Sequence, residues 1–182
     1  MNINNIVNVL VEQRKISRLN LFDVSLRDED DYMNALKASW VRTVQDVHNL
    51  LHNGGSILEI GSYYGVVALS LAKLNYKMTT FDVPEVQNNE KIKAIYLENQ
   101  IHTASGYLQN IPSTSLPFAK NSFDCVIMCE VLEHLNFNPL SVLKEINRVI
   151  RPGGFFYLTV PQSNPSQESR KISFRIFSQK PN

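Results

Sequence analysis

The sequence predicts an α/β fold with a doubly wound, mostly parallel sheet and helices on both faces. Three observations carry this prediction. An apolar run at residues 56–60 is followed by a turn that holds Gly61 and Gly65, and then by a helical pattern. A second apolar run ends at Asp82, about twenty residues after the turn, as in nucleotide-binding α/β folds. Strand-like and helix-like segments then keep alternating, which is typical of a parallel sheet.

The first 52 residues are expected to form a helical cover. Residues 3–14 have a short amphipathic pattern, residues 19–26 are ambiguous, and the apolar positions of residues 28–51 recur at a helical period. Residues 53–55 then end that helix, because glycine accepts the left-handed conformation of a C-cap. We therefore expect a cover at residues 1–52 and one compact α/β unit, abbreviated at its C-terminus, at residues 53–182.

The remaining elements follow from residue patterns. We expect strands at residues 56–60, 77–81, 101–108, 123–128 and 155–160, and helices at 66–74 and 88–99. Asn138 and Pro139 predict the start of another helix, because asparagine caps free amides and proline fits the first turn. Residues 151–154 are expected to end it. Residues 109–123 and 161–170 read as loops, and residues 172–177 alternate like a last strand.

The composition excludes several classes of protein. With 182 residues, 43% of them hydrophobic and 19% charged, the chain has the composition of a soluble globular domain. A net charge of +1 gives no sign of a nucleic-acid partner. Cys125 and Cys129 have neither a disulfide framework nor a metal-site spacing, which indicates reduced thiols and a cytoplasmic setting. We see no signal-peptide pattern and no apolar run long enough to cross a membrane.

The glycine turn indicates what kind of ligand the fold holds. A dinucleotide fingerprint needs three glycines, but here Tyr63 stands where the middle glycine would be. This disfavours a pyrophosphate against the turn, and with it a nicotinamide-dependent oxidoreductase. It suits a ligand with adenosine but no phosphate. A plain tight turn remains the alternative for Gly61 and Gly65.

Five short motifs occur in order between residues 56 and 161. They are Leu-Glu-Ile-Gly-Ser-x-x-Gly at 58–65, Phe-Asp at 81–82, Leu-Pro-Phe at 116–118 with Asn-Ser-Phe-Asp at 121–124, Glu-Val-Leu-Glu-His-Leu at 130–135, and Arg-Pro-Gly-Gly at 151–154. In this order they resemble the class I S-adenosylmethionine-dependent methyltransferases, and the fourth motif is similar to that of the type 11/12-like subgroup. The resemblance implies a Rossmann-like domain that binds S-adenosylmethionine.

The resemblance also implies a set of cofactor contacts. Around the methionine portion it places Glu59, Gly61, Ser62, Tyr63 and Gly65. Asp82 would accept hydrogen bonds from the ribose hydroxyls, with capping of the turn before Pro84 as the alternative, and Val83 would lie against the adenine. Cys129 and Glu130 would line the pocket near the sulfonium. The family often has an acid after its third strand; here Gln109 or Asn110 is expected to substitute for it.

Methyl transfer from a sulfonium is an in-line displacement, which needs a base only when the acceptor must lose a proton. His134, near the end of a core strand, is the candidate base together with Glu130; a histidine bonded to backbone in a first helical turn is the equal alternative. Glu130, Glu133 and His134 also resemble a cation-binding segment of some ubiquinone-pathway and small-RNA methyltransferases. No histidine follows His134, so we expect no metal, with a divalent cation at these residues as the alternative. We expect no RNA substrate, because the sequence has no basic patch with interleaved aromatics.

The C-terminal region and the cover complete the expectations. About twenty residues follow Val160, enough for one strand. An uncovered sheet edge favours pairing with a second copy, so we expect a homodimer or a loosely closed sheet. Residues 32–40 would cover the pocket. The expected function is methyl transfer to a small-molecule or peptide acceptor. A non-catalytic methyltransferase-like domain that binds cofactor or a partner is the alternative, favoured by Tyr63 and the short end.

Overall fold

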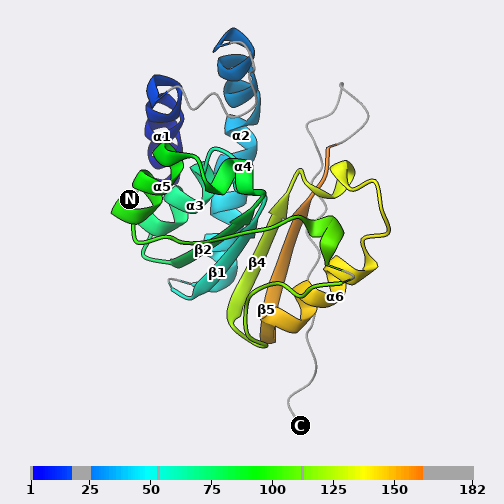
Figure 1. Cartoon of the computed structure of the whole chain (residues 1–182). Helices are drawn as coiled ribbons and strands as arrows, with labels where there is room; N and C mark the ends of the chain where they lie inside the picture. Colours follow the sequence, from blue (N-terminus) through cyan, green and yellow to red (C-terminus); the bar gives the residue numbers. More distant parts are fainter. Residues whose placement is uncertain (1, 18–25, 53, 112, 162–182) are drawn as a thin grey trace.

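The computed structural model describes residues 2–17, 26–52, 54–111 and 113–161. Within them, one sheet of five strands has the order β3-β2-β1-β4-β5, and every neighbouring pair is parallel (Figure 1). The strands are β1 (Ser56–Ile60), β2 (Lys77–Asp82), β3 (His102–Ser105), β4 (Phe123–Cys129) and β5 (Ile150–Thr159). The chain builds outward from β1 on one side and then returns to β4 on the other. The predicted doubly wound α/β fold is confirmed.

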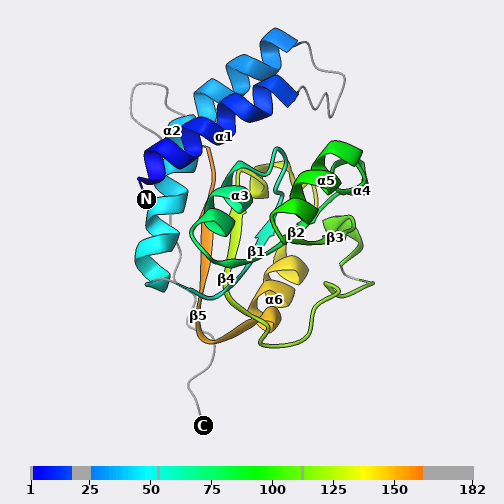
Figure 2. The ribbon, with the colours of Figure 1, turned by 90° about the vertical axis from the view of Figure 1, so that its left-hand side faces the viewer.

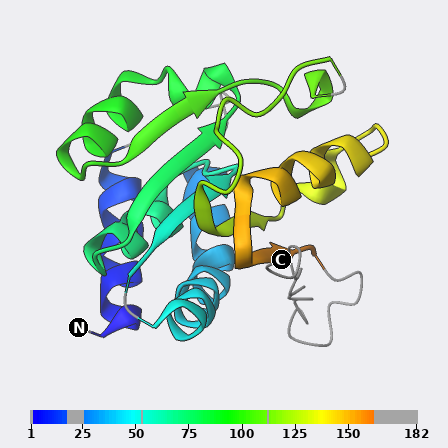
Figure 3. The ribbon, with the colours of Figure 1, turned by 90° about the horizontal axis from the view of Figure 1, so that it is seen from below.

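Helices cover both faces of this sheet (Figures 1 and 3). They are α1 (Ile3–Ser17), α2 (Leu26–Leu51), α3 (Val66–Lys73), α4 (Pro84–Gln87), α5 (Glu90–Glu98) and α6 (Leu140–Val149). Alternate strand residues feed two cores: Ile57 packs with α1, α2, α3 and α5, whereas its neighbour Leu58 packs with α6. This alternation follows from the period of two along a strand.

The cover predicted at the N-terminus is a pair of packed helices. Residues of α1 and α2 that are fully buried include Val7, Val11, Met33, Val44 and Val47. Figure 2 shows α1 lying across α2 above the sheet. The Tyr157 hydroxyl of β5 donates to Asp46 of α2 over 2.8 Å, which ties the long helix to the sheet. The division into a cover at 1–52 and a second unit at 53–182 stays a prediction.

Two predicted boundaries differ from those in the structure. The third strand stops at Ser105 and not at residue 108, because Leu108–Asn110 form a 3-10 turn. The helix expected at 88–99 is α5, which begins at Glu90 and not at residue 88, because the Asn89 side chain accepts the amides of Lys91 and Ile92. Asn138 does accept the Leu140 amide at the start of α6, over 3.0 Å.

The largest error concerns residues 151–154, which were expected to end a helix before a strand starting at 155. Instead α6 ends at Val149 and β5 already begins at Ile150, which pairs with Phe123. The next paired residues are Cys125 and Phe155, so the strand bulges between them. The helix therefore ends before these residues, but long-range pairing makes them part of the strand instead of a separate turn. The predicted strand at 172–177 and the ambiguous segment at 19–25 lie outside the described residues.

Candidate functional site

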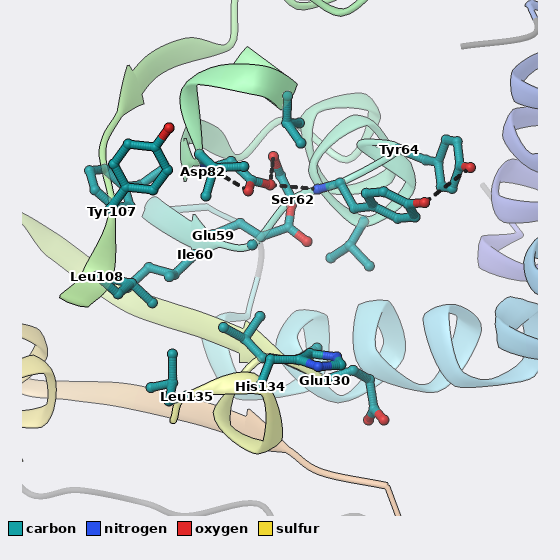
Figure 4. A pocket seen from close by; sticks show the side chains of 18 of the residues that line it. Glu59, Ile60, Ser62, Tyr64, Asp82, Tyr107, Leu108, Glu130, His134 and Leu135 are labelled. Carbon is teal, nitrogen blue, oxygen red and sulfur yellow. Dashed lines mark hydrogen bonds between the residues drawn. The ribbon is translucent and has the colours of Figure 1, made fainter. Parts of the chain in front are cut away.

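A cavity of about 480 Å³ lies at the carboxyl ends of β1, β2 and β4 (Figure 4). This is the point where the strand order reverses, the usual position of ligands in open α/β sheets. Tyr107 and Leu108 stand at one side of the close-up, and Tyr64 and Glu130 at the other. Helix α2 closes the latter side with Tyr32, Leu36, Ser39 and Trp40. The lining by residues 32–40 agrees with the position predicted for the cover.

Asp82 holds the glycine turn in place. Its Oδ2 accepts the backbone amide of Tyr63 at 2.8 Å and the Ser62 hydroxyl at 3.4 Å, while Oδ1 accepts the Val83 amide at 2.8 Å. Burial raises the pKa of this carboxyl, and these hydrogen bonds oppose the rise. The side chain also lines the cavity. Asp82 therefore builds the turn as well as facing a ligand, and a contact with ribose stays a prediction.

Tyr63 occupies a conformation that usually suits glycine. Its φ is +44°, in the left-handed region that side chains rarely adopt. Its ring contacts Tyr64 at a centroid distance of 4.1 Å and meets Tyr32 of α2 edge-on at 5.5 Å. The Tyr63 hydroxyl donates to that of Tyr64 over 3.2 Å. The ring contacts thus join the turn to the cover, and Tyr63 lines the cavity between them.

Glu59, at the end of β1, is a buried acid that faces the cavity. It is 4% exposed, and its Oε2 has no hydrogen-bond partner among the residues that the structure describes. Burial and the nearby Asp82 charge raise its pKa well above the ordinary value. A buried acceptor without a partner is costly unless a ligand completes it. The ammonium of an amino-acid moiety is such a donor, so this residue fits the methionine portion of S-adenosylmethionine.

The two glycines of the turn are required by packing inside the protein. Gly61 has φ of +77°, and a Cβ there would lie 2.3 Å from Cγ2 of Val131. Gly65 has φ of +73°, and its Cβ would lie 2.7 Å from the Tyr96 hydroxyl. Gly61 lines the cavity, whereas Gly65 is not among the lining residues. Gly65 instead provides the left-handed cap from which α3 starts.

Cys129 ends β4, Glu130 and His134 follow it, and all three line the cavity. Glu130 has φ of +55°, and its Oε1 accepts the Thr159 hydroxyl at 2.8 Å. The His134 side chain is 77% exposed at the rim, with Nε2 3.9 Å from Oε1 of Glu133. Its amide donates to the Val131 carbonyl within a 3-10 turn at Leu132–His134. The roles of His134 and Glu130 as bases stay predictions.

At the side of the cavity near Tyr107, only some of the residues predicted to contact the cofactor line the cavity. Val83 and Gln109 line it, but Asn110 is not among the lining residues. The Asn110 carbonyl instead accepts the amides of Ser113 and Thr114, which supports a surface turn. Tyr107, which the sequence reasoning missed, lines this side and donates its hydroxyl to Glu85 over 2.6 Å.

Other residues were missed as well. Val131, Leu135, Asn136 and Phe137 line the cavity. Val131 and Leu135 belong to the fourth motif, so the motif could have identified them, but no sequence pattern indicated Tyr107.

In the part of the chain that the structure describes, no group of three or more His, Cys, Asp or Glu residues is placed to hold a metal ion. No described helix is both long and apolar enough to span a membrane.

Comparison with known proteins assigns the chain to a family. The profile of the methyltransferase domain family matches residues 32–179, so the chain belongs to that family. Its members are S-adenosylmethionine-dependent, which makes that molecule the co-substrate. The finer assignment to the type 11/12-like subgroup stays a prediction.

Among curated proteins, the chain is similar to the ubiquinone biosynthesis O-methyltransferase of Xanthomonas oryzae, with 24% identity over 62% of this chain and 46% of that protein. It is also similar to the ubiquinone/menaquinone biosynthesis C-methyltransferase of Blochmanniella floridana, with 28% identity over 70% of this chain and 50% of that protein. The chain thus spans about half the length of these relatives. A solved S-adenosylmethionine-dependent methyltransferase from Aquifex aeolicus shares the fold, with a TM-score of 0.56 and 19% identity over 70% of this chain and 68% of that one.

Proposed function

We propose that this protein transfers a methyl group from S-adenosylmethionine to a small-molecule or peptide acceptor. The observation that carries the proposal is Glu59, a buried acid without a partner for Oε2, at the switch point of the sheet beside the turn that Asp82 holds. Membership of the methyltransferase domain family supports the same conclusion. A cytoplasmic setting, a homodimer and the absence of a nucleic-acid partner remain predictions from the sequence.

Each part of the cavity has a task in this proposal. The bound cofactor supplies an electrophilic methyl group and a neutral leaving group. Glu59 accepts the cofactor's ammonium, and Asp82 accepts its ribose hydroxyls while it keeps the turn folded. Val83 and Leu108 provide apolar surface for the adenine. Helix α2 excludes water from the other side, and His134 at the rim passes a proton to solvent when the acceptor must lose one.

The second candidate is a non-catalytic domain of the same fold that binds cofactor or a partner. Tyr63 favours it, because a tyrosine ring stands at a glycine position, contacts Tyr32 of α2 and lines the cavity. The two candidates differ in turnover: the second binds cofactor but transfers no methyl group to any acceptor. They do not differ in the contacts of Glu59 and Asp82.

The first test of cofactor binding is titration of the protein with S-adenosylhomocysteine by calorimetry, with NADH as the control ligand. We expect micromolar binding of the first and no binding of the second. Glu59→Gln keeps the size of the side chain but offers a weaker partner to an ammonium, so it should lower the affinity. Glu98→Gln, at an exposed position on α5, is the matched control. Absence of S-adenosylhomocysteine binding would contradict the proposal.

A further inference from the structure

The side of the cavity next to α2 combines aromatic faces with acids. Tyr32, Trp40 and Tyr63 line it, and Tyr32 meets Tyr63 edge-on at 5.5 Å. Glu130 lines the same side, where the Thr159 hydroxyl holds its carboxylate at 2.8 Å. Figure 4 shows Glu130 and Tyr64 on the side away from Tyr107. Aromatic faces beside a carboxylate are a favourable surrounding for an organic cation.

The described lining of the cavity contains several acids. Among the described residues that line the cavity, the acids are Glu59, Asp82 and Glu130, and none is lysine or arginine. Burial and the neighbouring Tyr63, Glu130 and Glu133 raise the pKa of Tyr32 to about 12. Glu130 and Glu133 thus contribute to this rise, after burial and Tyr63. Among the described lining residues an anionic group placed here would meet these acids and no lysine or arginine, which opposes its binding.

We propose that the α2 side of the cavity receives the methyl acceptor, and that this acceptor is an amine with an aromatic or apolar body, bound as its ammonium ion. The inference rests on the function proposed above. Tyr32, Tyr63 and Trp40 contact the body and the charge, and Glu130 attracts the charge. These four residues are then the determinants of acceptor choice.

The negative charge of Glu130 also favours an amine over a hydroxyl as the group that is methylated. A hydroxyl acceptor has to develop negative charge beside Glu130, which like charge opposes, whereas an ammonium that loses its proton becomes neutral. That proton leaves to water at the rim, where His134 stands. The nitrogen lone pair then bonds to the methyl carbon as the carbon–sulfur bond breaks, and sulfur keeps the bonding pair. The products are a methylated ammonium and a neutral thioether.

Three probes with the same phenol ring and different charges test the inference. They are tyramine, which carries an ammonium, 4-methylphenol, which is neutral, and 4-hydroxyphenylacetate, which carries a carboxylate. Each is titrated into protein saturated with S-adenosylhomocysteine, and binding is followed by ligand-observed NMR. We expect tyramine to bind about tenfold more tightly than the carboxylate probe, with 4-methylphenol between them.

Equal or tighter binding of the carboxylate probe, or no binding of tyramine, overturns the inference but leaves the proposed function intact if S-adenosylhomocysteine binds. Failure of S-adenosylhomocysteine to bind overturns the proposed function itself. Glu130→Gln should bring the affinities of the ammonium and carboxylate probes severalfold closer, since its amide still accepts the Thr159 hydroxyl but carries no charge. Glu98→Gln, outside the cavity, should leave their ratio unchanged; an equal effect of both variants would also overturn the assignment to Glu130.

Discussion

The backbone amide of Tyr63 donates a hydrogen bond of 2.8 Å to Oδ2 of Asp82, which joins the glycine turn after β1 to the end of β2. The other oxygen of the same carboxylate accepts the Val83 amide. One acid therefore fixes two stretches of backbone at the rim of the cavity. The shape of the ligand site and the fold of the turn depend on the same side chain.

This relationship predicts that Asp82→Ala damages binding and folding together. Without the carboxylate, the Tyr63 and Val83 amides lose their acceptor, so the free energy of unfolding should fall by about 1–3 kcal/mol. S-adenosylhomocysteine should bind at least about tenfold more weakly, a loss of about 1.4 kcal/mol. Asp82→Asn keeps one acceptor and should be intermediate in both. Urea denaturation and calorimetry measure the effects, with the exposed Asp31→Asn as control. Unchanged affinity in Asp82→Ala would refute this account.

The sequence predicted the framework of the fold because the framework depends on local patterns. The apolar runs that became β1, β2 and β4 are buried in the sheet, and the helical period of residues 28–51 is realised in α2. The acid at the end of β2 was expected to face the cavity and does so. These features require only residue type and spacing.

Features that depend on distant partners were missed. Residues 151–154 have the composition of a helix stop, but the pairing of Ile150 with Phe123 starts a strand there. Tyrosine does not favour a positive φ, so the residue type gives no hint of the conformation of Tyr63. The hydrogen bond from its backbone amide to Asp82 connects the turn after β1 to the end of β2, which are distant in the sequence. Tyr107 reaches the cavity from a segment with no motif. In each case tertiary contacts decided a conformation that the local sequence left open.

The backbone conformation of Tyr63 predicts that Tyr63→Gly is more stable than Tyr63→Ala, the reverse of the usual order in regular structure. At φ of +44° any residue with a Cβ is strained, whereas glycine is not. Both Tyr63→Ala and Tyr63→Gly remove the ring contacts with Tyr32 and Tyr64, so their difference reports on the backbone alone. We expect the glycine variant to be more stable by about 1 kcal/mol. Chemical denaturation of the pair measures it. Greater stability of the alanine variant, the usual order in regular structure, would show that Tyr63 is unstrained.

Gly61 and Gly153 form a second matched pair. Their φ values are +77° and +80°, but a Cβ at Gly61 would lie 2.3 Å from Val131 whereas one at Gly153 meets nothing within 4 Å. Gly153→Ala should therefore cost only the strain of the left-handed region, about 1–2 kcal/mol. Gly61→Ala adds a steric clash of about 1–3 kcal/mol more. Adding Val131→Ala should recover part of that excess. Thermal and urea unfolding measure these differences. Equal decreases in the free energy of unfolding of Gly61→Ala and Gly153→Ala would show that the turn relaxes and avoids the clash with Val131.

Glu59 predicts how stability depends on pH. Its pKa in the folded protein lies well above the ordinary value of 4.5, because burial and the Asp82 charge disfavour the ionised form. Between the unfolded and folded pKa values the folded state holds more protons, so this residue's contribution to the free energy of unfolding falls as pH rises through that window. Glu59→Gln cannot ionise at this position, so its free energy of unfolding should not show this decline. The difference in free energy of unfolding between the variant and the parent should therefore be more favourable to the variant at pH 8 than at pH 4. Urea denaturation of both proteins across this range measures the difference, with Glu98→Gln as the exposed control. Parallel pH profiles for parent and Glu59→Gln would show that Glu59 does not titrate as its burial requires.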